Sequence, residues 1–316
     1  GSMEQAEFTY GSEESLRLNA FTQTGWAFVG WGTSPAGGNI INDGSAFGEI
    51  SSSLISESDA PDSYRTDDNR TVYAQWRSIF DGGYGSAASP FVISDAADLY
   101  VLEATVNGTG TDGGFVTVAA EDGSKHIYYS GNDESGAAVY SANPYEGFYF
   151  RLTGDVSGFT GTIGRISTDL SQSSEHPDQD HPVYVQERYI TEAIYGKEMS
   201  AIVTGGDGAA PGTPFKGNFD GGNHTVDLNI NSELAGAGLF GYTDHAVISD
   251  LRLTGSVYGY SHVGALTGYA FGGSVSGVYS AAAVTSPGHD VGGVIGTFYE
   301  RASDYARSSV SRVFFA

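Results

Sequence analysis

The chain has no cysteine, and only 14 lysine and arginine residues accompany its 38 aspartate and glutamate residues. The absence of cysteine excludes a disulfide scaffold and thiolate metal sites. The net charge of −24 repels phosphate backbones and anionic lipid headgroups, so we expect neither nucleic acid nor a membrane surface as a partner. No apolar run approaches the roughly 20 residues that a membrane-spanning helix requires, so we predict no membrane insertion.

Proline is also scarce, with nine residues, whereas glycine is abundant, with 46. Glycine is about twice as frequent as on average, without the three-residue period that collagen requires. This composition is typical of β structure with many turns. Together with the acidic charge and the lack of cysteine, it indicates a bacterial extracellular protein. Residues 1–3 resemble a remnant of cloning, so we expect the chain to be a piece of a longer protein.

Residues 4–77 contain short alternating runs separated by clusters of Gly, Asn, Asp and Ser, which predict a small β-rich module. The succession of residues 10–21, 25–31 and 72–76 resembles the Listeria–Bacteroides repeat, an internalin B-repeat-like module of bacterial surface proteins. This resemblance implies a β-grasp-like fold. Members of the family usually begin with one more strand, which here is missing or reduced to residues 7–9.

A short helix is predicted to follow this module. Ser94 is suited to be its N-cap, Asp95 and Asp98 lie in its first turn, and Gly108 ends it. Its apolar residues fall on one face: Leu99, Leu102 and Val106. We therefore expect the helix to cover an apolar surface.

The last third of the chain contains three similar units. They share a glycine-containing motif at residues 237–241, 263–268 and 291–296, and a second motif at residues 248–251, 275–278 and 310–313. Gly238, Gly264 and Gly292 are 26 and 28 residues apart, and the second motifs start 27 and 35 residues apart, so one unit carries an insertion. Such a period predicts a solenoid of stacked coils. We expect the glycines to turn corners with positive φ and to allow close packing between coils.

These units resemble the GLUG motif, of which residues 238–241, Gly-Leu-Phe-Gly, are a direct instance. Residues 148–156 and 215–226 resemble the segments that lead into GLUG units. The resemblance implies a right-handed parallel β-helix capped at its N-terminal end by the helix near Ser94. Two insertions interrupt the pattern, at residues 111–147 and 166–213.

The predicted fold is therefore mainly β, a small β-grasp-like module followed by a capped, right-handed parallel β-helix with inserted loops. The first insertion contains an apparent hairpin around residues 115–129, and the second a helix near residues 187–199. The predicted division is 4–77 for the B-repeat-like module, 78–165 for the capping helix and first coils, 166–213 for the polar insertion and 214–316 for the GLUG coils. We expect the insertions to carry specificity, as surface loops often do.

One local string combines potential metal ligands. His176, Asp178, Asp180 and His181 could meet around a divalent ion. A solvated acidic loop explains the same residues, and the proline at position 177 favours that interpretation. We therefore predict no metal site.

Motifs for catalysis are missing from the chain. It contains neither a His-Glu-x-x-His zinc motif nor a Gly-x-Ser-x-Gly nucleophile elbow. The string of Gly108, Gly110 and Gly113 follows a predicted helix, so it indicates a helix stop rather than a dinucleotide site. Two carboxylates could act as the acid and base of a carbohydrate-cleaving enzyme, but 38 acidic residues make chance pairs unavoidable. We predict no catalytic residue and no cofactor.

The tyrosines allow two interpretations. Five of them lie among the repeats: Tyr242, Tyr258, Tyr260, Tyr269 and Tyr279. They could form a surface on which sugars or a protein partner stack. Tyrosine also simply suits a pleated β surface, the interpretation that we favour, and we name no ligand-binding residue.

Lysine is restricted to three positions: Lys125, Lys197 and Lys216. A Lys–Asn isopeptide crosslink, as found in some adhesins, therefore has few places to form. We expect none.

The two resemblances together imply a non-catalytic, extracellular segment of a bacterial surface protein that acts in adhesion or presents a ligand to host or matrix glycoproteins or glycans. An alternative is an accessory, substrate-positioning region of a secreted metallopeptidase that cleaves immunoglobulin A. A third hypothesis is a polysaccharide-cleaving β-helix. The third unit ends in the apolar residues 313–316, so we expect further coils or a cap in the parent protein and self-association through this end.

Overall fold

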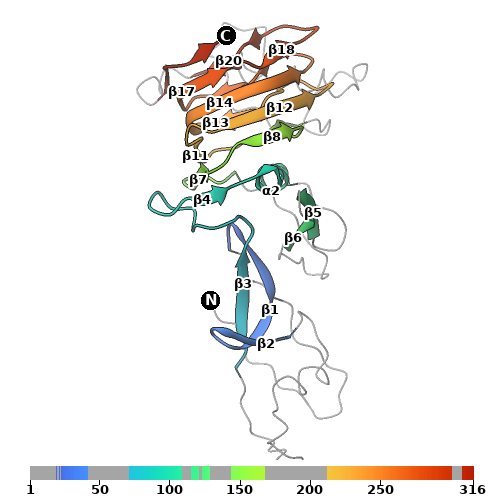
Figure 1. The fold of residues 1–316 in the computed structure, drawn as a ribbon, viewed down its shortest axis with the longest axis vertical. Coiled ribbons are helices and arrows are strands. Elements are labelled where there is room, and N and C mark those ends of the chain that lie inside the picture. Colours follow the sequence, from blue (N-terminus) through green and yellow to red (C-terminus); the bar gives the residue numbers. More distant parts are fainter. Residues whose placement is uncertain are drawn as a thin grey trace, which may run out of the picture. The chain divides into compact units, whose positions relative to one another are not determined.

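A computed structural model of the chain provides the fold. It describes residues 19, 21, 23–41, 71–108, 115–120, 123–128, 144–167, 212–300 and 308–316. The chain divides into two compact units, the first built mainly from residues 1–79 and the second mainly from residues 80–109 and 141–316. The described part is mainly β, with one helix (Figure 1).

The first unit contains a three-stranded antiparallel sheet in the order β2-β1-β3. Its strands are β1 (Trp26–Ser34), β2 (Gly37–Ile41) and β3 (Tyr73–Ser78). Phe28 and Trp31 are buried on one face, with their ring centroids 5.1 Å apart, and Val72, Ala74 and Trp76 pack against them. The strands predicted at residues 25–31 and 72–76 are thus confirmed. The strand predicted at residues 7–9 lies outside the described residues.

The second unit contains the helix α2 (Ala96–Asn107). Its N-cap is Asp95, whose side chain accepts a hydrogen bond from the Asp98 backbone N–H, so the prediction of Ser94 as N-cap was wrong by one residue. The Ser94 N–H instead donates to the Asp98 carboxylate at 2.8 Å. Gly108 ends the helix in the left-handed conformation at φ 63°, as predicted.

The largest sheet of the second unit has ten strands, all paired in parallel. Six of them follow the order β21-β17-β14-β11-β7-β4: β4 (Phe91–Ile93), β7 (Tyr149–Leu152), β11 (Asn218–Asp220), β14 (Val247–Tyr258), β17 (Ser274–Ser280) and β21 (Ser309–Ser311). The others are β8 (Val156–Phe159), β12 (Thr225–Asn231), β18 (Ala283–Thr285) and β22 (Phe314–Phe315).

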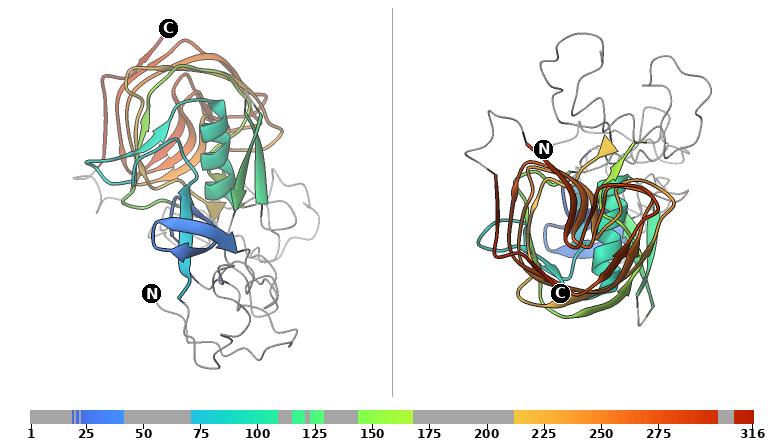
Figure 2. Two further views of the ribbon diagram at one scale, coloured as in Figure 1. Left: turned by 60° about the horizontal axis from the view of Figure 1, so that its bottom comes forward. Right: turned by 90° about the horizontal axis from the view of Figure 1, so that it is seen from above.

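Two smaller parallel sheets accompany the large one. One contains β13 (Phe240–Asp244), β16 (Thr267–Phe271) and β20 (Ile295–Tyr299), in that order. The other pairs β15 (Val263–Gly264) with β19 (Val291–Gly292). Seen from above, the strands of the large sheet from β12 to β22 lie over one another (Figure 2, right).

The strand register reproduces the alignment of the repeats. Val263 pairs with Val291 and Gly264 with Gly292. In the second motif, Ile248 pairs with Val275, and Val275 with Val310. Residues that align in the sequence therefore lie side by side on successive levels, where a level is one repeat unit together with the strands that it contributes to the sheets.

The motif glycines serve close packing and not corners. A Cβ atom at Gly264 would lie 2.5 to 2.6 Å from backbone atoms of Thr267, Val294 and Gly296, so no side chain fits there. Gly238, Gly264 and Gly292 do not have positive φ, so the expectation that they turn corners was wrong. Positive φ occurs elsewhere in the repeats, where a non-glycine residue often adopts it.

The core between the sheets is aromatic and continues from level to level. Phe91 lies 5.5 Å from Phe150, Phe150 lies 5.8 Å from Phe215, and Phe215 lies 5.0 Å from Phe240, measured between ring centroids. All four side chains are buried. Such contacts stabilise the stack beyond the area that they bury.

Helix α2 lies against β8 at one end of this stack (Figure 1). The predicted apolar residues of the helix are fully buried: Leu99, Leu102 and Val106. Polar contacts next to this face add to the attachment, because the Thr162 N–H donates to the Glu103 carboxylate at 2.9 Å and the Asn107 amide donates to the Thr162 carbonyl at 2.9 Å. The helix therefore covers apolar surface, as expected.

Both predicted insertions have described parts. A two-stranded sheet of β5 (Phe115–Ala120) and β6 (Gly123–Tyr128) confirms the hairpin. At the ends of the second insertion, β9 (Arg165–Ile166) pairs antiparallel with β10 (Gly212–Thr213), so the chain leaves and re-enters the unit at neighbouring positions. The helix predicted near residues 187–199 lies outside the described residues.

Candidate functional site

At one corner of the repeats, the residue on each of three successive levels has the left-handed backbone conformation. Gly236, His262 and Asp290 each precede the paired residues Ala237, Val263 and Val291, and their φ angles are 77°, 49° and 56°. Among non-glycine residues, His, Asn and Asp tolerate this conformation best. The corner therefore places a histidine and an aspartate directly above one another.

A third residue completes a cluster at this corner. The Asp290 Oδ2 atom lies 3.4 Å from His262 Nδ1 and 3.0 Å from His289 Nδ1. The ligand atoms of all three residues lie within 4.8 Å of one another. His262 is nearly buried, with 4% of its side chain exposed, whereas His289 and Asp290 are exposed at 63% and 51%. The cluster thus has one side in the protein and one side in solvent.

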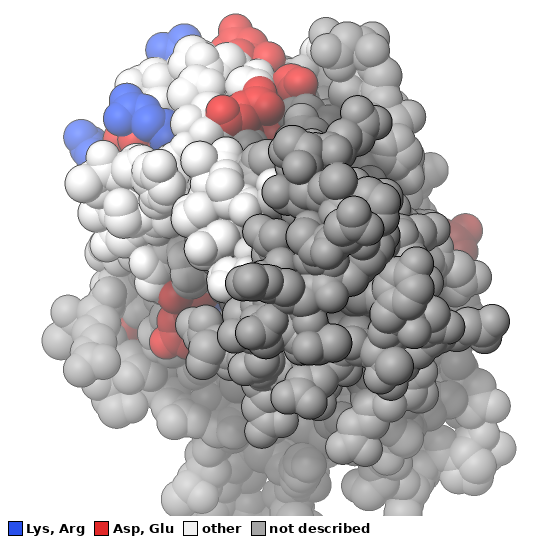
Figure 3. Space-filling model, turned by 90° about the horizontal axis from the view of Figure 1, so that it is seen from below, with Lys and Arg blue, Asp and Glu red and all other residues white. Residues whose placement is uncertain are grey.

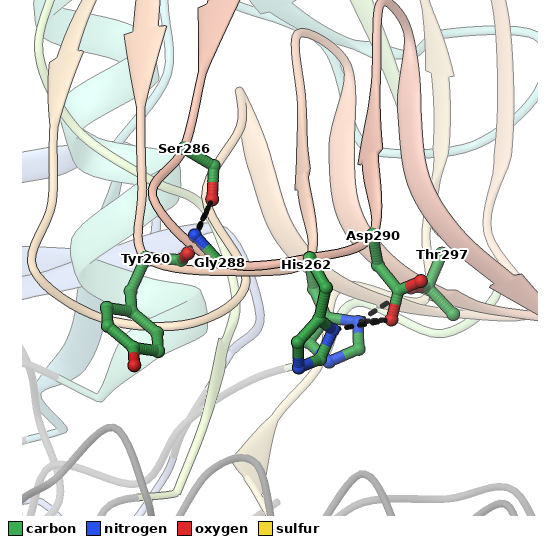
Figure 4. A network of polar contacts seen from close by, with 7 residues as sticks. Tyr260, His262, Ser286, Gly288, Asp290 and Thr297 are labelled. Atoms are coloured by element: carbon green, nitrogen blue, oxygen red, sulfur yellow. Dashed lines mark hydrogen bonds and ion pairs between the residues drawn. The ribbon is translucent and has the colours of Figure 1, made fainter.

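Figure 4 shows the side chains of the cluster, and backbone hydrogen bonds hold them in place. The His262 N–H donates to the His289 carbonyl and the Val263 N–H to the Asp290 carbonyl, both at 3.0 Å. The turn before His289 is tied to the previous level, because the Gly288 N–H and the Ser286 hydroxyl both donate to the Tyr260 carbonyl. These bonds join residues on neighbouring levels, so the positions of the three side chains follow from the stacking.

The Thr297 hydroxyl also contacts the buried histidine, at 2.6 Å from His262 Nδ1. A Ser/Thr-His-Asp triad requires the hydroxyl and the carboxylate on opposite nitrogens of the ring. Here Thr297 and Asp290 both approach Nδ1, so this geometry does not relay a proton from the hydroxyl to the carboxylate. Two imidazoles and a carboxylate are, however, a donor set for a divalent metal ion.

A second His–Asp pair in the repeats has different surroundings. Asp244 lies 2.5 Å from His245 Nδ1, and its other oxygen lies 2.6 Å from Lys216 Nζ. The His245 ring packs edge-on against Phe271 at 5.0 Å. A lysine charge therefore already neutralises this carboxylate.

Two other carboxylates have shifted pKa values. The Thr225 backbone N–H, 2.8 Å from Asp155, lowers the pKa of that exposed carboxyl, and His224 adds to the effect. Burial raises the pKa of Glu103, and its hydrogen bond from Thr162 opposes this only in part. Each shift follows from local packing and identifies no acid–base pair.

The metal ligands considered in the sequence, His176, Asp178, Asp180 and His181, lie outside the described residues. The structure adds a group of potential ligands that is not local in the sequence, because the stack brings His262 to His289 and Asp290. The signal was present in the repeats, since His262 and Asp290 directly precede the aligned residues of the first motif. Which residue pairs meet depends on the vertical register of the levels.

The structure separates the five repeat tyrosines. Tyr242 and Tyr269 are fully buried and pack on each other at 5.6 Å, so a stacking surface cannot include them. Tyr260 is half-buried, and Tyr258 and Tyr279 are exposed. The exposed pair is not adjacent in register, because Tyr279 is level with Arg252.

Lys216, in its ion pair with Asp244, is the one lysine whose side chain is described. Of the glycines in the Gly-x-Gly-x-x-Gly string, Gly108 ends helix α2. Gly110 and Gly113 lie outside the described residues.

The described surface carries its charge in small groups. On the face drawn in Figure 3, acidic and basic side chains of the described part form separate clusters on largely uncharged surface. Within the described residues, no helix is both long enough and apolar enough to cross a membrane.

No protein-family model, curated protein or solved structure matches the chain. The function therefore has to be argued from the residues and their arrangement.

Proposed function

We propose that the chain is a non-catalytic, extracellular segment of a bacterial surface protein whose repeats present a rigid binding surface to host or matrix glycoproteins or glycans. In this proposal, residues 78–316 form a right-handed parallel β-helix of GLUG-like coils with a polar insertion at 166–213, and residues 4–77 form a B-repeat-like module. The observation that carries it is the parallel pairing of aligned repeats, Val263 with Val291 and Val275 with Val310. Crossover connections between parallel strands are almost always right-handed, which supports the handedness.

The outward face of the large sheet is the surface that we propose for binding. Along β12, Val226, Leu228 and Ile230 are buried, whereas the residues between them face outward. The outward residues of β12, β14 and β17 include polar and aromatic side chains: Asp227, Asn229, Asn231, Arg252, Tyr258 and Tyr279. Exposed tyrosines with amides and hydroxyls suit recognition by stacking and hydrogen bonding.

The proposal further rests on the state of the described carboxylates. Asp155, Asp220, Asp244 and Asp290 each lie within 4 Å of a nitrogen of His, Lys or Arg. Each of these carboxylates therefore has a structural partner. Extracellular location and the absence of catalysis remain part of the same proposal.

The test uses the full chain on a glycan array and in pull-downs with purified matrix and mucosal glycoproteins. We expect saturable binding that falls at least about tenfold in Tyr258→Ser and Tyr279→Ser, because aromatic residues dominate binding surfaces. Tyr84→Ser is the matched control, since Tyr84 is exposed but lies outside the sheet. Equal loss in the control, or no binding to any glycan or glycoprotein, contradicts the proposal.

A parallel assay separates the alternatives. Incubation with neutral and acidic polysaccharides should release no reducing ends. A rise in reducing ends would favour a polysaccharide-cleaving β-helix. Selective capture of immunoglobulin A, without glycan binding, would favour the accessory region of a metallopeptidase.

A further inference from the structure

The spacing of donor atoms at the His262 corner matches a zinc site. Four ligands at the usual 2.0 to 2.1 Å from zinc in a tetrahedral arrangement lie about 3.3 Å from one another. Asp290 Oδ2 lies 3.4 Å from His262 Nδ1 and 3.0 Å from His289 Nδ1, on either side of that value. The Asp290 carboxylate therefore lies at a suitable distance from both histidines, and the donor atoms of all three residues lie within 4.8 Å of one another.

The donor types select the class of metal. Calcium and magnesium take oxygen ligands almost exclusively, which two imidazoles do not provide. Two histidines and one carboxylate suit zinc and related first-row divalent ions. Three protein ligands also leave a fourth position for water or an external group, and the exposure of His289 and Asp290 gives that position access to solvent.

Backbone conformation alone does not explain these residues. Gly236 occupies the same left-handed corner on the preceding level, so glycine satisfies the turn there without a side chain. His262 and Asp290 adopt φ 49° and 56°, a conformation that costs a non-glycine residue conformational energy. Neighbouring strands lie about 4.8 Å apart, so side chains from the same corner on adjacent levels come within reach of one ion.

Charge distinguishes this corner from the His245–Asp244 pair. Asp244 has Lys216 at 2.6 Å, so a fixed positive charge already faces it. The ion-pair partners of Asp290 in the described part of the chain are His262 and His289. A cation between these three residues would supply the positive charge that lysine supplies at Asp244.

We infer that His262, His289 and Asp290 form a zinc-binding site that links two successive levels of the repeats. His262 comes from the level of β15, and His289 and Asp290 from the turn before β19. Binding exchanges the contact between His262 Nδ1 and the Thr297 hydroxyl for a metal bond, and a hydroxyl can rotate to another partner. Because the ion binds only the stacked form, it stabilises the stack against unfolding.

The test is equilibrium dialysis of the chelator-treated full chain against zinc chloride. We expect one tightly bound zinc ion per chain, and at least about tenfold weaker binding in His289→Ala and Asp290→Asn, because losing even an outer partner of a zinc ligand costs that much. Both side chains are exposed, and asparagine tolerates positive φ, so circular dichroism should be unchanged in these variants. Bound cobalt should give the intense visible absorption of a tetrahedral site, and zinc should raise the Tm of the unmodified chain more than that of His289→Ala or Asp290→Asn.

Two controls make the result decisive. His176→Ala/His181→Ala removes the other histidine string of the chain, and His245→Asn removes the histidine of the lysine-paired corner. Both should keep the zinc ion. Loss of zinc in the first control, retention of full affinity in His289→Ala and Asp290→Asn, or no stoichiometric uptake by the unmodified chain would each overturn the inference.

Discussion

Strands β13, β16 and β20 occupy equivalent positions on three successive levels but differ in burial. Every residue of β13 and β16 is buried, whereas every residue of β20 is half-buried. The second motif follows the same trend, because Val275, Val278 and Ser280 of β17 are buried, whereas β21 is exposed throughout. Equivalent sequence positions thus have unequal surroundings.

The cause lies in the neighbours and not in the strands themselves. All three strands carry glycine at their second residue, at positions 241, 268 and 296. Ile163 and β16 lie on the two sides of β13, and β13 and β20 on the two sides of β16. Among the described residues, β20 pairs on one side only. In a stacked repeat, each level is buried by the next one.

The largest loss of stability should come from adding a side chain at Gly264, where the backbones of neighbouring levels approach each other closely. Gly264→Ala places a methyl group within 2.6 Å of three backbone atoms, so we expect a loss of about 3 kcal/mol of unfolding free energy. Gly293→Ala is the matched control near the last strands. The three atoms nearest to its new methyl group all belong to the ring of Phe315, which is 57% exposed and can turn aside, so the loss should stay below about 1 kcal/mol. Urea unfolding measures both, and equal losses would refute the contrast between central and last levels.

The next prediction concerns self-association through the exposed aromatic residues of the last strand. Phe314 and Phe315 are 62% and 57% exposed on β22, so we expect the unmodified chain to associate at rising concentration. Phe314→Ser/Phe315→Ser should shift sedimentation equilibrium to the monomer with little change in stability. Val247→Ser, at an exposed position of β14, should leave association unchanged. A monomeric unmodified chain would remove the basis for this prediction.

The smallest change in stability should come from Glu103 in helix α2, which covers the other end of the large sheet. Because burial raises the pKa of Glu103, the folded state favours the protonated carboxyl, and this contribution is lost as pH rises through the raised pKa. Glu103→Gln keeps an acceptor for the Thr162 N–H and avoids the buried charge. We expect it to gain less than about 1 kcal/mol at neutral pH, with the difference vanishing in acid. A larger gain in acid than at neutral pH would reverse the assigned sign.

Several features followed from the sequence alone. The spacing of the glycine motifs gave the register of β15 with β19, and the apolar face of α2 gave its buried side. The N-cap of α2 was missed by one residue because Ser94 and Asp95 are both good caps, and only the backbone conformation selects one. Tyrosine type alone did not separate the buried Tyr242 and Tyr269 from the exposed Tyr258, because tyrosine suits both faces of a β strand.

The sequence by itself determined which residues are equivalent on successive levels, because apolar periodicity and glycine spacing are properties of the chain. Only the tertiary structure decided that His262 meets His289 and Asp290, while Asp244 meets Lys216. Such contacts join residues 27 or 28 positions apart, and at the His262 corner two left-handed residues, His262 and Asp290, are stacked. Local pattern thus sets the level, and the packing of levels creates the site.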